Sequence, residues 1–199
     1  MTLLELSSET LREGSIPVLE TERLVLRAPR LEDAKAIAVL ANDRRIAENT
    51  RRIPHPYTRA DAENFIGSVN TANGETAFLI NLADGTLIGA CGLAMTEGPA
   101  HELGYWLGVP YWGRGFATEA VRAVIDYAFT DLEHDALQAG ARVTNPASRR
   151  ILEKCGFQWT GVGLCRIRAL ASSAPIDRFR LDRGLWASLK SWGRTRRVA

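Results

Sequence analysis

Alternation of apolar and polar positions predicts strands along most of the chain. Residues 23–28 (RLVLRA) alternate between apolar and polar residues, which is typical of a half-buried strand. Two apolar runs, residues 76–83 and 86–95, are joined by Asp84-Gly85, a dipeptide that suits the two-residue turn of a β-hairpin. A loop is predicted at residues 172–175, between the last two strands. The further predicted strands are residues 101–107, 137–144, 157–168 and 177–183.

Apolar residues at helical spacing predict helices between these strands. The longest covers residues 113–132, with alanine, valine and isoleucine on one face and polar residues such as Arg122 on the other. Another helix begins at Asn145-Pro146, because asparagine is a good N-cap and proline fits the first helical position. Gly156 suits the C-terminal cap of that helix. The other predicted helices are residues 31–42, 58–69 and 184–192.

The predicted order is one strand, two helices, three strands, a helix, a strand, a helix and two strands, which indicates a mixed α/β fold. The chain has 199 residues, of which 46% are hydrophobic and 24% charged, as in one soluble globular domain. We expect a single domain at residues 21–192, a variable lead-in at residues 1–20 and a basic tail at residues 193–199. Three leucines of the lead-in are compatible with a short packed helix there: Leu4, Leu6 and Leu11.

Composition and charge disfavour several classes of protein. No apolar run approaches the ~18 residues that span a bilayer, and the glutamates near the N-terminus argue against a secretory signal. The net charge of +2 is too small to indicate a nucleic-acid partner. Residues 178–199 are basic, which fits a solvated tail helix or an anionic partner. Three widely spaced cysteines favour neither a disulfide framework nor a zinc site, so a reducing cytoplasm fits best.

A glycine-rich turn ahead of the longest helix carries the clearest chemical signal. At Gly113 and Gly115 the missing Cβ lets a ligand lie against the backbone. The first N–H groups of a helix lack internal acceptors and carry the positive end of its dipole, so the turn suits a phosphate or pyrophosphate. Thr118 replaces the third glycine of a dinucleotide fingerprint, and no Walker pattern is present. On spacing alone, the alternative is a tight turn at the start of a helix with no ligand.

Five stretches of the chain, in the same order, resemble the GNAT superfamily of acyl-CoA-dependent N-acyltransferases. They are most similar to its ribosomal-protein N-terminal acetyltransferase (RimJ/RimL-like) branch. The superfamily's pyrophosphate loop reads Q/R-x-x-G-x-G/A, and here Trp112 stands where Gln or Arg is usual. The resemblance extends over about residues 21–189. The stretches are TERLVLR (21–27), IPHPYT (53–58), ELGYWL (102–107), WGRGFATEA (112–120) and NPASRRILEKCGF (145–157).

The resemblance implies a GNAT fold with acetyl-CoA as donor. This fold has a mostly antiparallel twisted sheet of about seven strands, flanked by helices, with a splayed central parallel strand pair. The pantetheine arm would lie in the splay, where the backbone near Leu107 polarises the thioester carbonyl and Asn145 bonds the amide arm. Val109 ends one of the splayed strands. Arg149 is either a phosphate contact or a solvated arginine. The pyrophosphate would be held by backbone N–H groups of Gly113, Arg114, Gly115, Phe116, Ala117 and Thr118.

Acetyl transfer needs a neutral amine and a donor for the departing thiolate. Glu102 is the candidate general base, because it lies on an apolar strand just before the glycine turn; a surface-facing or arginine-paired carboxylate is the alternative. The resemblance makes Ser148 the candidate general acid, aimed at the sulfur; a serine satisfying a backbone N–H is the alternative. Much of the superfamily has a tyrosine at the position of Leu152.

We therefore expect an N-acetyltransferase in which the amine attacks acetyl-CoA directly in a ternary complex. The branch implies a protein N-terminal α-amine as acceptor. A small-molecule amine (an amino acid, polyamine or antibiotic) and a non-catalytic acyl-CoA-binding module stay open. Acceptor specificity is expected in residues 42–57 and 168–178, where an excess of arginine disfavours polyamines and leaves room for a carboxylate or phosphate. A homodimer is compatible with the sequence, whereas no metal, membrane or nucleic-acid partner is expected.

Overall fold

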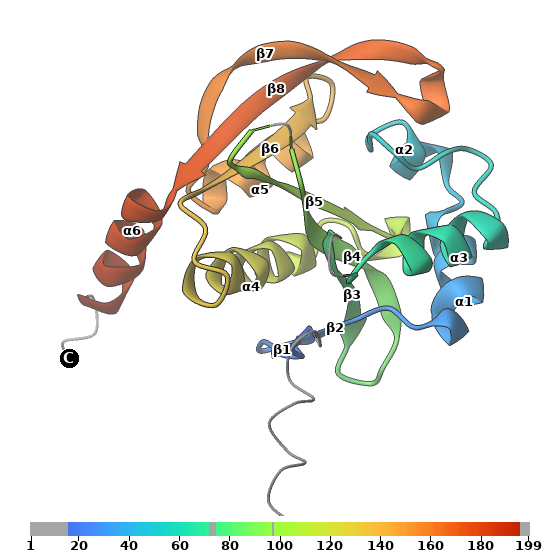
Figure 1. Ribbon diagram of the computed structural model, residues 1–199, viewed down its shortest axis with the longest axis horizontal. Coiled ribbons are helices and arrows are strands. Elements are labelled where there is room, and N and C mark those ends of the chain that lie inside the picture. Colours follow the sequence, from blue (N-terminus) through green and yellow to red (C-terminus); the bar gives the residue numbers. More distant parts are fainter. Residues whose placement is uncertain (1–15, 72–74, 97, 196–199) are drawn as a thin grey trace, which may run out of the picture.

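The computed structural model describes residues 16–71, 75–96 and 98–195, and an eight-stranded sheet runs through its centre (Figure 1). The strand order is β1-β2-β3-β4-β5-β6-β8-β7, in which β5 and β6 are parallel and every other neighbouring pair is antiparallel. The predicted fold class is thereby confirmed. The strands are β1 (Leu19–Glu20), β2 (Leu24–Arg27), β3 (Thr76–Leu82), β4 (Leu87–Ala94), β5 (His101–Leu107), β6 (Ala136–Arg142), β7 (Gln158–Ile167) and β8 (Ser172–Asp182).

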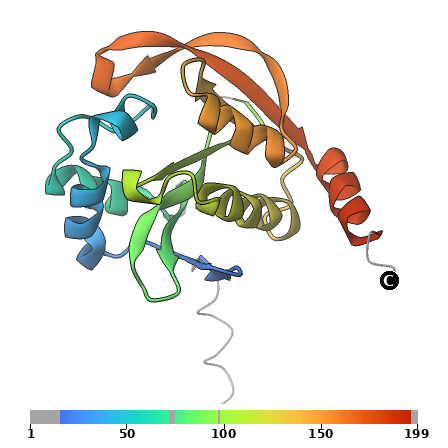
Figure 2. The same ribbon diagram turned by 180° about the vertical axis from the view of Figure 1, so that it is seen from behind.

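Helices pack against both faces of the sheet, as the two opposite views show (Figures 1 and 2). Neighbouring residues of β3 point to opposite faces, so Phe78 enters the core under α4 and α5, and Leu79 enters the core under α1 and α3. No helix in the described part of the chain is long and apolar enough to cross a membrane. The helices are α1 (Ala34–Ala41), α2 (Arg44–Ala47), α3 (Arg59–Ser68), α4 (Phe116–Thr130), α5 (Pro146–Lys154) and α6 (Arg183–Thr195).

The parallel pair β5 and β6 separates part-way along its length. Pairing covers only residues 101–103 of β5 and 137–139 of β6. Beyond that point β5 continues along β4 to Leu107, and β6 continues along β8 to Arg142. A gap therefore opens in the middle of the sheet, as the resemblance predicted. Its two edges are β5 and β6, which stay hydrogen-bonded to β4 and β8.

The structure corrects two predictions of local structure. Residues 172–175 are the start of β8 rather than a loop, because the chain reverses earlier, in the 3-10 turn η3 (Arg168–Leu170) followed by Ala171 at φ 50°. The longest helix begins at Phe116 rather than residue 113, because Gly113 and Gly115 adopt positive φ values of 73° and 82°. The short elements β1 and α2 had no sequence signal. The leucine-rich segment 4–11 lies outside the described residues.

Candidate active site

The glycine turn between β5 and α4 has the open backbone that an anion cradle needs. A Cβ built on Gly113 meets nothing within 4 Å, and Gly115 is the left-handed N-cap of α4. The amide of Glu119 donates to the Gly115 carbonyl at 3.1 Å, so the N–H groups ahead of it lie before the helical ladder begins. The indole Nε1 of Trp112 donates to the Leu107 carbonyl at 2.8 Å and ties the turn to the end of β5. The residues present therefore fit a pyrophosphate.

A half-buried carboxylate fastens this turn to the N-terminal segment. Glu119 accepts hydrogen bonds from Thr21 Oγ1 at 2.7 Å and from Arg23 N and Nε at 2.9 and 2.7 Å. The Arg23 guanidinium also donates to the Arg114 carbonyl and stacks on the Phe116 ring. Burial alone would raise the pKa of Glu119, but these hydrogen bonds outweigh it and lower that pKa. The TERL stretch thus has a physical role, which is to hold the glycine turn in place.

A cleft of about 410 Å³ runs from the glycine turn to the gap in the sheet, and we name it the donor cleft. Its basic lining residues are Arg45, Arg150 and Lys154. Arg149 points elsewhere, with Nε 2.9 Å from Glu153 and Nη1 3.4 Å from Asp177. The geometry therefore favours Arg150 and Lys154 over Arg149 as phosphate contacts. Of the predicted cofactor residues, the lining includes Leu107, Gly113, Gly115, Phe116, Ala117, Thr118 and Asn145, whereas Val109 and Arg114 lie in the same loop outside it.

The start of α5 brings two hydroxyl groups together beside the gap. Asn145 caps the helix, and its Oδ1 accepts from the Ser148 amide at 3.1 Å. A hydrogen bond from Asn145 to a cofactor amide would therefore come from Nδ2. The Ser148 hydroxyl lies 2.8 Å from the Tyr105 hydroxyl of β5. Burial raises the pKa of Tyr105 well above its usual value, so the phenol stays protonated.

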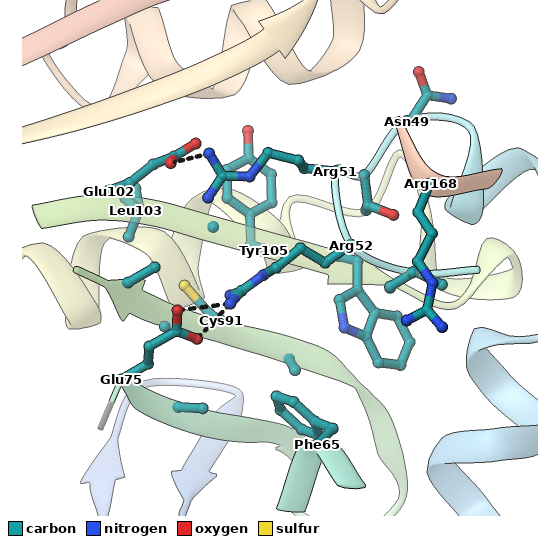
Figure 3. Close-up of a pocket in the computed structure, with 18 of the residues that line it drawn as sticks. Asn49, Arg51, Arg52, Phe65, Glu75, Cys91, Glu102, Leu103, Tyr105 and Arg168 are labelled. Carbon is teal, nitrogen blue, oxygen red and sulfur yellow. Dashed lines mark hydrogen bonds and ion pairs between the residues drawn. The ribbon is translucent and has the colours of Figure 1, made fainter. Parts of the chain in front are cut away.

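A second cleft, of about 510 Å³, lies on the α3 side of the sheet, and we name it the acceptor cleft (Figure 3). One wall is the loop at residues 49–54 and another is the tip of the β7–β8 hairpin, including Arg168. The Arg168 amide donates to the Arg51 carbonyl at 3.1 Å and joins the two walls. The two segments that were expected to carry acceptor specificity therefore line the same cleft.

Arginine–carboxylate pairs lie along the acceptor cleft. Glu102 bonds Arg51 at 2.9 Å, and Glu75 bonds Arg52 at 2.6 Å, as Figure 3 shows. Glu102 shares a strand face with Gly104 and Trp106, opposite to the face of Leu103 and its core neighbours. The predicted base thus lies in the acceptor cleft with an arginine partner, which was the alternative environment for this carboxylate. Its role as a base stays a prediction.

The two clefts meet at the gap between β5 and β6. Both are lined by Tyr105 and Trp106 of β5, by Ser148 of α5 and by Asn49 and Thr50 of the loop after α2. A group bound in one cleft can therefore contact a group bound in the other. The hydroxyl groups of Tyr105 and Ser148 lie at this junction, and the carboxylate of Glu102 lies in the acceptor cleft.

Tyr105 packs against the core and lines both clefts, and its hydroxyl contacts the Ser148 hydroxyl, which the sequence did not predict. The wider superfamily's tyrosine position on α5 is filled by Leu152, whose side chain is fully buried. The structure brings a tyrosine hydroxyl to the junction from β5 instead. The signal available in the sequence was the spacing of Tyr105 from Leu103 and Leu107, which places it on the inner face of the strand.

Two cysteines near the site, Cys91 and Cys155, are poor nucleophiles. Burial raises the pKa of Cys155 to about 11 and that of Cys91 higher still. Both thiols therefore stay protonated at neutral pH, when a nucleophilic cysteine would need to be a thiolate. This favours direct attack of an amine over an acyl-cysteine route.

The chain belongs to the GNAT acetyltransferase family. The model of the family "Acetyltransferase (GNAT) domain" matches residues 23–158. The Bacillus licheniformis protein "Uncharacterized N-acetyltransferase p20" is 33% identical over 151 residues, which cover 72% of this chain and 84% of that protein. The protein is thus an acetyl-CoA-dependent acetyltransferase, as was expected.

Two further proteins are similar to this chain. YdaF of Bacillus subtilis, provisionally named a ribosomal N-acetyltransferase, is 37% identical over 78 residues, covering 38% of this chain and 43% of that protein. The spermidine N-acetyltransferase of Vibrio cholerae, solved with CoA and spermine, is similar in fold with a TM-score of 0.72 and 24% identity. The match covers 84% of this chain and 99% of that chain. Acetyl-CoA is the cofactor that this family uses.

The contacts of Glu119 predict that Glu119→Gln weakens donor binding. The substitution removes the charge that orients Arg23 and the glycine turn. We expect the free energy of unfolding to fall by about 1–2 kcal/mol and the affinity for acetyl-CoA, measured by calorimetry at pH 7.5, to fall roughly three- to tenfold. Glu63→Gln is the matched control, because Glu63 forms an exposed i,i+4 pair with Arg59. Equal acetyl-CoA affinity in both variants would contradict this role.

Proposed function

We propose that this enzyme acetylates the α-amino group of a protein or peptide N-terminus, as the RimJ/RimL-like branch does. The observation that carries the proposal is the meeting of the donor and acceptor clefts at Tyr105, Trp106 and Ser148. An amine held in one cleft and a thioester held in the other would lie within reach of each other. Holding two reactants in this way lowers the barrier by several kcal/mol without a covalent enzyme intermediate.

The donor side is built from backbone groups. The N–H groups of residues 113–118 would hold the pyrophosphate, with Arg150 and Lys154 close by. The pantetheine arm would enter the gap between β5 and β6, beside Asn145. There the backbone near Leu107 would polarise the thioester carbonyl, which supplies the stabilisation that a developing oxyanion needs.

Glu102 is the proposed acceptor of the amine's proton, directly or through water. An α-amine has a reference pKa of about 7.7–8.0, so a substantial fraction is neutral near pH 7.5, whereas a lysine side chain with a pKa of about 10.4 is almost fully charged. A carboxylate in the acceptor cleft can take the remaining proton as the bond to carbon forms. Arg51 fixes the direction of the Glu102 carboxylate, since the two groups are 2.9 Å apart.

Tyr105 and Ser148 are the proposed partners of the departing thiolate. Their hydroxyls are 2.8 Å apart, so one can donate to the other while the second donates to sulfur. Because burial raises the pKa of Tyr105, its phenol stays a donor and does not ionise. Complete proton transfer is not required, because a thiol has a reference pKa of about 8.5 and leaves readily as thiolate.

The charge of the acceptor cleft supports an α-amine over a polyamine. The carboxylates that would attract a polycation, Glu75 and Glu102, already pair with arginines. The ribosomal N-acetyltransferase name given to YdaF supports the same acceptor. So do the five motifs that resemble the RimJ/RimL-like branch.

The test measures acetyl-CoA-dependent thiol release with N-terminal peptides, amino acids, polyamines and aminoglycosides as acceptors. We expect turnover of α-amines and roughly a 10²- to 10⁴-fold lower kcat for Glu102→Gln, because this variant lacks the proton acceptor. Turnover of polyamines alone would contradict the proposed acceptor. Tight binding of acetyl-CoA without turnover of any amine would identify a binding module instead.

The hydroxyl pair predicts that Tyr105→Phe and Ser148→Ala lower kcat by about 5- to 50-fold each, because each removes a hydrogen bond near the sulfur. The double variant should lose little more than either single variant, since the two hydroxyls act as one unit. Stopped-flow measurement of thiol release separates this effect from donor binding. Additive losses, or an unchanged kcat with a raised KM, would show that the hydroxyls do not act on the leaving group.

A further inference from the structure

One arginine of the acceptor cleft has no carboxylate partner among the described residues. The lining of this cleft includes four arginines and three carboxylates. Three arginines are matched one to one with these carboxylates, so the fourth, Arg142, leaves the cleft with an excess of one positive charge. The matched pairs are Arg51–Glu102 at 2.9 Å, Arg52–Glu75 at 2.6 Å and Arg168–Asp61 at 3.8 Å.

The hydrogen-bonding capacity of Arg142 is not fully used. Its Nη1 donates to the Glu48 carbonyl at 2.9 Å. Its Nε is buried, and no acceptor for it lies within the described part of the chain. Buried donors in folded proteins nearly always have an acceptor, from protein, water or ligand, because leaving one unpaired is costly. A guanidinium that lines a cleft under these conditions favours an anionic ligand.

Arg142 is also close to the place where the reaction would occur. The pairing of β5 with β6 ends at Leu103 and Ala139. Three residues further along, Trp106 on β5 and Arg142 on β6 flank the gap, and both line the acceptor cleft. Trp106 lines the donor cleft as well. An anion on Arg142 would therefore be a near neighbour of the reacting amine.

We propose that Arg142 binds a carboxylate that the acceptor carries near its amine. This inference rests on the proposed function and narrows its substrate class to amines with a nearby anionic group. The α-carboxylate of an amino acid and an acidic side chain near a peptide N-terminus offer the same chemistry, and a phosphate ester offers a related one. Arginine suits all three, because its planar guanidinium donates to two oxygens at once.

The experiment compares kcat/KM, expressed per neutral amine, for acceptors with and without an anionic group near the amine. The pairs are alanine with alaninamide, peptides beginning Asp with peptides beginning Asn, and phosphoethanolamine with ethanolamine. We expect the wild-type enzyme to prefer the charged member of at least one pair by about 10- to 100-fold. Arg142→Gln should reduce that preference to within about twofold, and Arg142→Lys should restore part of it.

Two controls separate anion binding from a structural role. If Arg142 acted only through the Glu48 carbonyl, Arg142→Gln would lower kcat/KM equally for charged and neutral acceptors. Arg59→Gln removes an exposed arginine of α3 that pairs with Glu63 and should leave the preference unchanged. The pair with the largest preference shows whether the carboxylate is an α-carboxylate or an acidic side chain, whereas a preference confined to phosphoethanolamine would contradict the carboxylate proposal.

A binding measurement keeps this inference separate from the proposed activity. Calorimetry with CoA present compares N-acetylalanine with N-acetylalaninamide, and N-acetylaspartate with N-acetylasparagine, without any turnover. Tighter binding of a more anionic member, lost in Arg142→Gln, supports the anion site even if no amine is acetylated, and only the proposed function would then fail. Equal binding by the wild-type protein within both pairs, or a preference that survives in Arg142→Gln, overturns the inference.

Discussion

The parallel pairing of β5 and β6 stops after three residues of each strand, and the arrangement of the site depends on that break. Each strand stays hydrogen-bonded to its outer neighbour, β4 or β8, so the gap has two ordered edges. The glycine turn follows the end of β5, and the start of α5 follows the end of β6. The glycine turn proposed to hold the pyrophosphate, the Tyr105–Ser148 hydroxyl pair and Arg142 are therefore all placed by one interruption in one sheet.

Long-range polar contacts hold the segments around this gap. Glu119 fastens the glycine turn to Thr21 and Arg23, about a hundred residues earlier in the chain. On the other face, the Arg168 amide joins the hairpin tip to the loop at Arg51, and Arg142 reaches the Glu48 carbonyl. Each contact holds a segment outside the helices and strands, either the residues before β2 or the loop after α2. The contacts of Arg168 and Arg142 hold the loop that forms one wall of the acceptor cleft.

The sequence predicted the parts of the protein whose physics is local. Strand alternation, the hairpin at Asp84-Gly85 and the Asn145-Pro146 helix start each depend on a few neighbouring residues, and the structure has all three. The hairpin turn is longer than the two residues predicted, because it begins at Ala83 and the Leu82 amide donates to the Thr86 carbonyl. The glycine turn was predicted on the same basis. The start of α4 was placed too early, because the helical stripe gives no sign that Gly113 and Gly115 take positive φ values.

The acceptor cleft could be predicted only in outline. The two segments that form its walls were identified, but their contact depends on how the β7–β8 hairpin crosses the sheet, and the hairpin reverses at η3, where no turn had been predicted. The contacts of single side chains could not be predicted for the same reason, which is that they join distant segments of the chain. The partner of Glu102, the hydroxyl neighbour of Ser148 and the unmatched charge of Arg142 each depend on residues more than forty positions away.

The central claim is that the donor and acceptor clefts meet at the gap, and a bisubstrate compound tests it most directly. In such a compound, the sulfur of CoA is joined through a CH2–C(=O) linker to the α-amine nitrogen of a short peptide. We expect calorimetry to give a Kd at least about 100-fold lower than that of CoA, since one molecule occupies both clefts. Gly104→Val should remove this advantage and keep CoA binding, because a Cβ at Gly104 meets no protein atom within 4 Å and enters the acceptor cleft. A bisubstrate that binds no more tightly than CoA would contradict the account.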